Sequence, residues 1–292
     1  MVGPTAVGKT AVAIALATHF HTEIISADSR QCFKELNIGV ARPSAEELKT
    51  IKHYFIASHS IKDDVNAAVF EKYALEKVYE IFKVHDVAVM VGGTGLYIKA
   101  FYEGLHDMPD TDPMIRKKIF MNYEQKGLSW LQQEIREKDP EFYQEGEIKN
   151  PQRLMRALEV VESTGRSILS YRKGEPAKRD FTIVKIGLEL PKEELHRNID
   201  ARVDTMMRNG LLDEVKQLAF YKNLNALQTV GYSELFEYLD KKISLDEAVE
   251  QIKKNTRQYA KRQMTWFRKD KEVTWFDPVD IKKVLDFADM KI

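Results

Sequence analysis

The sequence has one cysteine, no excess of either charge and no long apolar run. Cys32 is the single cysteine among 292 residues, which excludes an internal disulfide and a zinc site built from several thiolates. A lone thiol is typical of a protein kept in a reducing compartment. The 45 basic residues equal the 45 acidic ones, so a surface for a polyanion must come from local clustering of positive charge.

The most apolar stretch near the start, Ala11–Ala17, is too short to cross a membrane. We find no internal repeat and no low-complexity tract, and 43% of the residues are hydrophobic, as in ordinary globular proteins. A chain of this length can form one large core or two domains. We therefore expect a soluble, cytoplasmic protein that does not bind membranes.

The first ten residues contain a phosphate-binding loop of the pattern G-x-x-x-x-G-K-[ST]. Its residues are Gly3, Pro4, Thr5, Ala6, Val7, Gly8, Lys9 and Thr10. Glycines let successive backbone N–H groups point at phosphate oxygens, the lysine adds a charge, and the Thr10 hydroxyl can ligate Mg²⁺. A helix is predicted to open at Lys9, directing its positive end at the same anion. The motif should follow a buried strand, and here only Met1 and Val2 precede it.

A second candidate stretch follows the apolar run Glu23–Ala27, which predicts a buried parallel strand. Asp28, Ser29, Arg30 and Gln31 come at its carboxyl end, where α/β sheets bind their ligands. From this position Asp28 can be a Mg²⁺ ligand, a general base or a cap of the local backbone.

The next predicted strand, Val87–Val91, ends in Gly92-Gly93-Thr94-Gly95. ATPases with a phosphate loop often place a magnesium-binding carboxylate at such a strand end. Here the strand 87–91 is followed by glycines and Thr94, and the nearest candidate carboxylate is Asp28, after the strand 23–27. This pattern argues against a kinase and strengthens a functional role for Asp28.

The segment from Asp112 to about Arg179 is predicted to be helical, with no convincing strand. Asp112-Pro113 and Asn150-Pro151 are helix starts, Pro140 is a helix stop, and Gly165 ends the last helix of the segment. Basic side chains at Arg116, Arg153 and Arg156 are either a solvated face or a surface for a phosphate backbone. The predicted fold is α/β: a P-loop NTPase-like parallel sheet core with helices on both faces (residues 1–111 and 181–292) and a helical insertion domain (residues 112–180).

The last third of the sequence predicts a return to the core. A strand over Phe181–Leu190 precedes a helix with Leu195, Ile199 and Val203 on its buried face and Arg202 beside that face. Arg202 is then either a structural salt-bridge partner or an anion clamp. Ser244 is predicted to cap a long final helix, and Val273–Phe276 is a candidate last strand.

These motifs, in this order, resemble those of the tRNA dimethylallyltransferases (tRNA isopentenyltransferases) of the bacterial type over nearly the whole chain. The matching stretches are GPTAVGKT at 3–10, DSRQ at 28–31, NIGVARP at 37–43, GGTGLY at 92–97, QRLMRALEV at 152–160, the Arg202 helix, TVGYSE near Tyr232, and TRQYAKRQMTWFRK at 256–269. The family transfers a dimethylallyl group from its diphosphate, with Mg²⁺, to N6 of the adenine on the 3′ side of the tRNA anticodon. The segment 228–233 lacks the arginines that often flank the family's VGY.

The resemblance implies roles for individual residues. The phosphate loop would bind the diphosphate of dimethylallyl diphosphate, Asp28 would be the general base, Thr94 would lie beside the reacting amine, and Arg202 would bind the diphosphate. Contacts to the tRNA anticodon stem-loop are implied for Asp28, Ser29, Arg30, Gln31, Thr94, Arg116, Gln152, Arg153, Leu154, Met155 and Arg156. The cofactor expected is Mg²⁺, with Thr10 as a ligand, and the protein is expected to be a monomer.

Three other functions compete with this hypothesis. A prenyltransferase acting on free adenine nucleotides would share the donor chemistry without needing the basic helical segment. A small-molecule kinase would use the phosphate loop for ATP. A non-catalytic RNA-binding protein would bind tRNA without making a product.

Overall fold

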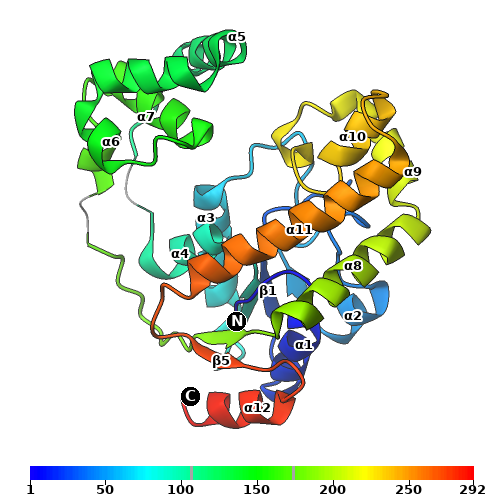
Figure 1. Ribbon diagram of the computed structural model, residues 1–292. Coiled ribbons are helices and arrows are strands. Elements are labelled where there is room, and N and C mark those ends of the chain that lie inside the picture. The colour runs from blue at the N-terminus through cyan, green and yellow to red at the C-terminus, as the bar shows by residue number, and fades with distance from the viewer. Residues whose placement is uncertain (106–107, 173–174) are drawn as a thin grey trace. The chain divides into compact units, whose positions relative to one another are not determined.

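The computed structural model describes residues 1–105, 108–172 and 175–292 and separates the chain into two units (Figure 1). Unit 1 consists of Met1–Glu103 together with Arg179–Ile292, and unit 2 of Gly104–Lys178. The two stretches of unit 1 therefore come from opposite ends of the sequence.

A small parallel sheet lies in unit 1. Strand β1 (Ile24–Ala27) pairs with β2 (His53–Tyr54) on one side and with β3 (Val89–Gly92) on the other. Strands β4 (Ile186–Leu188) and β5 (Thr274–Phe276) form a second parallel pair. The predicted strands at 23–27, 87–91 and 273–276 are confirmed, and the one predicted at 181–190 is shorter than expected.

Val2 joins the two groups of strands. It bridges Gly92 of β3 and Gly187 of β4, both in parallel register. Its N–H donates to the Ile186 carbonyl at 2.8 Å, and its carbonyl accepts from the Leu188 N–H at 2.9 Å. The residue before the phosphate loop thus occupies the position in the sheet at which we expected a strand.

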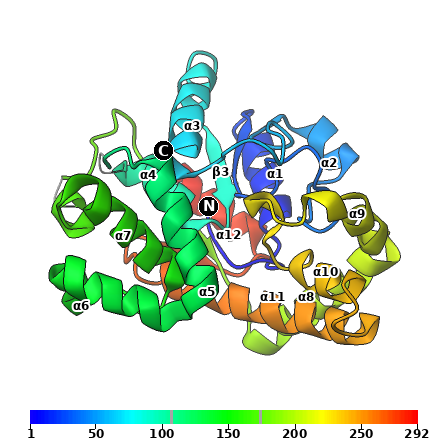
Figure 2. The ribbon, with the colours of Figure 1, turned by 90° about the horizontal axis from the view of Figure 1, so that it is seen from above.

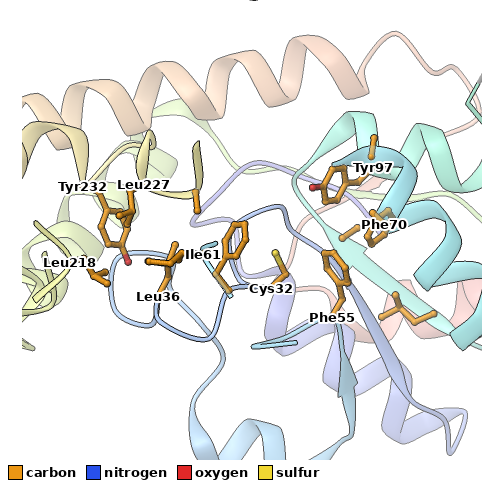
Figure 3. Packing of buried hydrophobic residues seen from close by; sticks show 14 of the residues in the cluster. Cys32, Leu36, Phe55, Ile61, Phe70, Tyr97, Leu218, Leu227 and Tyr232 are labelled. Carbon is orange, nitrogen blue, oxygen red and sulfur yellow. The ribbon is translucent and has the colours of Figure 1, made fainter. Parts of the chain in front are cut away.

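Adjacent side chains of β1 enter different cores, because successive residues of a strand face opposite sides of the sheet. Ile25 packs in a cluster with α3 (Ala67–Ile81) and α4 (Gly95–Glu103). Ile24 packs in a cluster with α1 (Lys9–His19) and α12 (Ile281–Asp289). Helices therefore cover both faces of the sheet. Figure 3 shows the first cluster extending from Phe70 and Tyr97 through Cys32 to Tyr232.

Helices of the second half of the chain complete unit 1. They are α8 (Lys192–Arg208), α9 (Leu211–Gln217), α10 (Ser233–Leu239) and α11 (Leu245–Phe267), with short 3₁₀ turns η2 (Ala219–Tyr221) and η3 (Asn225–Leu227). Helix α11 lies alongside α8 in Figure 1 and in Figure 2. Ion pairs Arg257–Asp200 and Lys253–Asp204 join the two helices.

Helix starts in unit 1 agree with the sequence, apart from one omission. Ser44 before α2 (Ala45–Thr50) and Ser244 before α11 both form a capping box, and Asn66 caps α3. The prediction that α11 is the final helix is wrong, because α12 follows it and buries Val284 and Ala288.

The regular elements among the described residues of unit 2 are all helical: α5 (Pro113–Lys138), α6 (Pro140–Glu145), α7 (Pro151–Thr164) and the 3₁₀ turn η1 (Ile168–Arg172). Gly127, at φ 73°, interrupts α5 and divides it into two helical stretches. Pro140 does end the preceding helix, and it also opens α6 as its first residue, where a missing N–H costs nothing. The unit has its own core, which includes Ile119, Leu131, Ile135, Phe142, Leu154 and Leu158.

Candidate active site

The phosphate loop connects Val2 to α1. Gly3, Ala6 and Gly8 have φ angles of 155°, 65° and 97°, which curl the backbone around the loop. A side chain at Gly3 would have its Cβ 2.7 Å from the Leu188 carbonyl oxygen, so the loop lies tightly against β4. Thr10 lies in the first turn of α1, while Pro4, Ala6 and Val7 are buried.

The Lys9 ammonium folds back onto its own loop. Its Nζ donates to the Gly3 carbonyl at 3.0 Å and to the Pro4 carbonyl at 2.6 Å. Burial lowers the pKa of Lys9 to about 7; the negative charge of Asp28 opposes this shift and the positive charge of Arg202 adds to it. Asp28 and Arg202 therefore act electrostatically on the same lysine, as expected of residues sharing a site.

Gln263 of α11 joins the phosphate loop to the glycine turn after β3. Its Oε1 accepts from the Thr5 N–H at 2.8 Å, and its Nε2 donates to the Gly93 carbonyl at 2.9 Å. The side chain is 6% exposed. Gln263 lies within the matching stretch 256–269, but its role could not be predicted, since helical periodicity does not show that an amide contacts two distant loops.

Arg202 extends from α8 to the same loop. Its Nη1 lies 3.5 Å from the Thr5 hydroxyl oxygen, at the limit of a hydrogen bond. Burial lowers the pKa of the guanidinium, and no carboxylate in the described part of the chain forms a salt bridge with it. An unpaired, largely buried arginine beside a phosphate loop is suited to bind an anion.

Asp28 follows β1, and its carboxylate organises the turn after that strand. Oδ1 accepts from the backbone N–H groups of Arg30 at 2.8 Å and Gln31 at 3.2 Å. Within the described residues, Oδ2 accepts no hydrogen bond. The capping role that the sequence left open is therefore present, and the second oxygen is free for chemistry.

Thr94 connects the turns after β1 and β3. Its N–H donates to the Ala27 carbonyl at 3.2 Å, and its hydroxyl accepts from the Ser29 N–H at 3.0 Å. The Thr94 hydroxyl also donates to Ser29 Oγ at 3.3 Å. Asp28 and Thr94 are thus held at neighbouring strand ends, as the sequence predicts.

Tyr259 of α11 is a further residue close to Asp28. Burial, together with the negative charge of Asp28, raises the pKa of its hydroxyl to about 12. The residue is 36% exposed, so the neutral tyrosine presents part of its surface to solvent.

Arg30 and Gln31 are bound to other loops of unit 1. Arg30 donates to the Asn225 carbonyl at 2.9 Å. The Gln31 amide donates to the Val40 and Ala41 carbonyls at 3.2 and 3.0 Å. In this conformation the Gln31 side chain fixes the 37–43 loop.

Glu214 connects two motifs whose roles were open. Its carboxylate accepts from the N–H groups of Asn37, Ile38 and Gly39 at 3.1, 2.8 and 3.1 Å, and from the Tyr232 hydroxyl at 2.6 Å. A Cβ at Gly39 would lie 2.6 Å from the Tyr232 ring. The VGY segment around Tyr232 therefore supports the 37–43 loop from inside the core.

A cavity of about 1000 Å³ opens beside the phosphate loop. Its walls come from the loop and α1, from the 37–43 loop with α2, and from α8, and they include Ala6, Gly8, Asn37, Arg42, Asn198 and Arg202. A second cavity, of about 830 Å³, lies near β3 and β4 and contains none of the predicted site residues.

The predicted nucleic-acid residues of unit 2 divide into exposed and buried groups. Gln152 and Arg153 are exposed at the start of α7, and Arg116 on α5 is 70% exposed while lying 3.6 Å from the buried Glu159. Arg156 pairs with Glu159 at 3.2 Å and donates to Thr111.

Leu154 and Met155, predicted as tRNA contacts, lie in the core of unit 2. Their exposed fractions are 0% and 6%, because they occupy the face of α7 that packs on α5. Their side chains are thus not available to a ligand in this conformation.

The described residues contain neither a cluster of metal ligands nor a membrane-spanning helix. No group of three or more His, Cys, Asp or Glu side chains is placed to hold a metal ion. No helix among these residues has the length and apolarity needed to span a bilayer.

Comparison with known proteins agrees with the motifs. The chain is 48% identical to the tRNA dimethylallyltransferase of Christiangramia forsetii, over 100% of this chain and 97% of that protein. The structure is similar to that of the tRNA isopentenylpyrophosphate transferase of Bacillus halodurans, with a TM-score of 0.72 and 32% identity over 99% of this chain and 94% of that one.

A eukaryotic dimethylallyltransferase acting on tRNA is also similar, with a TM-score of 0.78 and 25% identity over 97% of this chain and 74% of that one. The family model described as IPP transferase matches residues 31–270. On the extent of these matches, the chain belongs to the IPP transferase family, and it is a transferase.

Proposed function

We propose that this protein transfers the dimethylallyl group of dimethylallyl diphosphate to N6 of the adenine on the 3′ side of the tRNA anticodon. The observation that carries the proposal is the grouping of Asp28, Thr94, Lys9 and Arg202 around one phosphate loop. The relatives' activity agrees with a site that has a base at one strand end and an anion-binding loop beside it.

In this proposal unit 1 corresponds to a P-loop NTPase-like core that binds diphosphate in place of ATP, and residues 112–180 correspond to a helical insertion that binds tRNA. The parallel order of β2, β1, β3, Val2, β4 and β5 supports the first assignment. The separate core of Gly104–Lys178 and its exposed arginines support the second.

The base assigned to the reaction is Asp28. An exocyclic adenine amine is a weak nucleophile, because its lone pair is delocalised into the ring. As the N6–C bond forms and the C–O bond to diphosphate breaks, the amine must lose a proton, which the free Oδ2 of Asp28 can accept. Thr94, fixed by Ser29, is positioned to contact the amine.

The leaving diphosphate requires positive charge and N–H donors. Lys9, Arg202 and the backbone of Gly3 to Thr10 can supply them from a buried site, where each interaction is stronger than in water.

The Thr10 hydroxyl forms no hydrogen bond within the described protein, so it fits the role of an oxygen ligand to Mg²⁺, an ion that otherwise coordinates phosphates and water. When bound, Mg²⁺ would neutralise charge developing on the diphosphate.

The adenine must leave its base stack to reach Asp28, as is usual for enzymes that modify a base. We assign contacts with the anticodon stem-loop to the strand-end residues of unit 1 and, in unit 2, to Arg116, Gln152, Arg153 and Arg156. We further propose that the protein acts as a monomer in the cytoplasm.

The test is label transfer. Protein is incubated with Mg²⁺ and radiolabelled dimethylallyl diphosphate, with unmodified tRNA or AMP as acceptor. We expect label in tRNA at the adenine beside the anticodon. Label in AMP alone would replace the proposal with a nucleotide prenyltransferase, and phosphate transfer from ATP to a small acceptor would replace it with a kinase. Binding of tRNA without product would indicate a non-catalytic RNA-binding protein.

A further inference from the structure

We propose that Gln263 is a positioning residue that holds the donor-binding loop in register with the turn that carries Thr94. The inference rests on the proposed function, since it concerns how the two halves of that site are aligned. The Gln263 amide forms one hydrogen bond with the backbone of the phosphate loop, at Thr5, and one with the backbone of the glycine turn, at Gly93.

On the donor side, Gln263 contacts one peptide group of the phosphate loop. The Thr5 N–H is bound by Gln263, while the carbonyl of the same peptide, Pro4 C=O, accepts from Lys9 Nζ. The orientation of this peptide group is thereby fixed from both ends. A rotation of the Pro4–Thr5 peptide would release Lys9 from its contact and turn an N–H away from Gln263.

On the acceptor side, Gln263 contacts the glycine turn after β3. The Gly93 carbonyl accepts from Gln263 Nε2, and the next residue is Thr94. A Cβ built on Gly93 would lie 2.2 Å from that Nε2 atom, so the amide reaches the carbonyl only because residue 93 has no side chain. The same crowding recurs at Gly95, whose Cβ would lie 2.3 Å from the Trp266 ring.

Helix α11 therefore presents a row of side chains to the site. Tyr259 lies one turn before Gln263 and near Asp28, while the Trp266 ring packs against Gly95. The middle of α11 is joined to α8 by the ion pairs Arg257–Asp200 and Lys253–Asp204. Because α8 carries Arg202, the diphosphate side and the acceptor side of the site share one rigid support.

The burial of Gln263 is the reason that its two hydrogen bonds matter. A buried amide that loses one partner leaves an unsatisfied polar group, so the native pair of bonds is strongly preferred over alternatives. Catalysis between two bound substrates is sensitive to displacement, and a shift of about 1 Å can reduce a rate about 10²-fold.

The test uses Gln263→Ala, with Gln258→Ala as the matched control. Gln258 is a glutamine on the exposed side of the same helix. In single-turnover label transfer at saturating donor and tRNA, we expect Q263A to lose about 10- to 100-fold in rate. The dissociation constant for labelled dimethylallyl diphosphate without tRNA should change less than about threefold, because Lys9 and Arg202 remain in the site. The control should stay within about twofold of wild type.

A double-mutant cycle separates positioning from general damage. Gly93→Ala forces the amide away without altering α11, so it should lower the rate as Q263A does. In the combined variant, the alanine at 263 leaves room for the new Cβ, and the loss should equal that of Q263A alone. Additive losses would show that the two positions act independently and would overturn the proposal.

Gln263→Glu supplies a conservative variant with a pH signature. Its carboxylate can still accept from Thr5, but when ionised it opposes the Gly93 carbonyl, whereas the protonated form can donate to it. The rate relative to wild type at the same pH should therefore rise as pH falls. Burial raises the pKa of a carboxyl above its ordinary value of about 4.3, so a constant ratio across about pH 5 to 8 would contradict the role of the Gly93 contact.

Amide hydrogen exchange decides the proposal independently of activity. Peptides covering residues 3–10 and 92–97 should both exchange faster in Q263A and not in Q258A. If wild type transfers no label, the proposed function fails, while joint loosening of the two loops still supports the positioning role. Loosening confined to α11, or a Q263A rate above half of wild type, would overturn it.

Discussion

Single side chains at this site serve both the backbone and the proposed chemistry. Asp28 holds the turn after β1 through Oδ1 and has Oδ2 free, and Lys9 binds its own loop through two carbonyls. A substitution therefore tests two properties at once, and the variant must be chosen to separate them.

Asp28→Asn is the informative change at the strand end. Asparagine keeps an oxygen for the Arg30 and Gln31 N–H groups but cannot act as a base at neutral pH. We expect turnover to fall about 10²- to 10⁴-fold, with tRNA affinity near that of wild type. The measurements are initial rates of label transfer and filter binding of tRNA. Asp28→Ala, which also removes the turn contact, is the comparison, and a fully active D28N would exclude the base role.

Lys9 should couple donor binding to proton uptake. With a pKa of about 7, the buried amine is mostly neutral in the free protein at pH 8, and a bound diphosphate favours the charged form. Binding at pH 8 should take up close to one proton, and donor affinity should fall as pH rises above 7. Calorimetry in two buffers of different ionisation enthalpy measures the uptake. Uptake that persists unchanged in Lys9→Met would assign the proton to another group.

At the scale of helices and strands, most of the fold could be predicted from local sequence. Capping boxes at Ser44 and Ser244, the caps Asp112 and Asn150, and the glycine end at Gly165 all specify backbone geometry within a few residues. Helix α12 was missed because nine residues carry a short signal, and its burial depends on α1, far away in sequence.

The site could be predicted only in part, because local sequence signals do not report contacts between distant segments. Motifs at strand ends, such as Asp28 and Thr94, could be placed together because parallel strands end at one edge. The roles of Gln263, Glu214 and Tyr259 depend on contacts between segments that periodicity does not relate. Leu154 and Met155 are buried because they lie on the face of α7 that packs against α5. A match to a family motif covers consecutive residues and does not show which of them lie on that face.

The start of α7 offers a clean test of nucleic-acid binding. Arg153 is exposed and forms no salt bridge within the described residues, whereas Arg156 also pairs with the buried Glu159. Arg153→Ala should weaken tRNA binding and lower the slope of log affinity against log salt by about 0.7 to 0.9, the value for one phosphate contact. Titrations at several salt concentrations measure both.

Lys282→Ala is the control for that titration, since Lys282 is an exposed cation on α12. It removes the same unit of charge from a different surface. Equal effects of the two variants would indicate that the α7 face contributes only to the overall charge of the protein.

The whole molecule contains separate hydrophobic cores. The core of unit 2 is built from residues of 108–171, and those of unit 1 from the remaining described chain. Stability should therefore respond locally to changes within either unit.

Leu154→Ala tests this separation. Removing a fully buried leucine side chain should destabilise unit 2 by about 2–5 kcal/mol through lost burial and a cavity. Hydrogen exchange should increase in peptides from 108–172 and stay unchanged in the sheet of unit 1. Met121→Ala, at a 52% exposed position of α5, should shift stability by less than about 0.5 kcal/mol. Equal loosening of both units by L154A would show that they unfold as one.

The contact between Thr5 and Gln263 joins residues 258 positions apart. Because ribosomes add about 5–20 residues per second, the phosphate loop is made many seconds before α11. Until then its Thr5 N–H and the Gly93 carbonyl lack their common partner. Diphosphate binding with native geometry should consequently appear only after α11 has left the ribosome, although the loop itself is translated long before that helix.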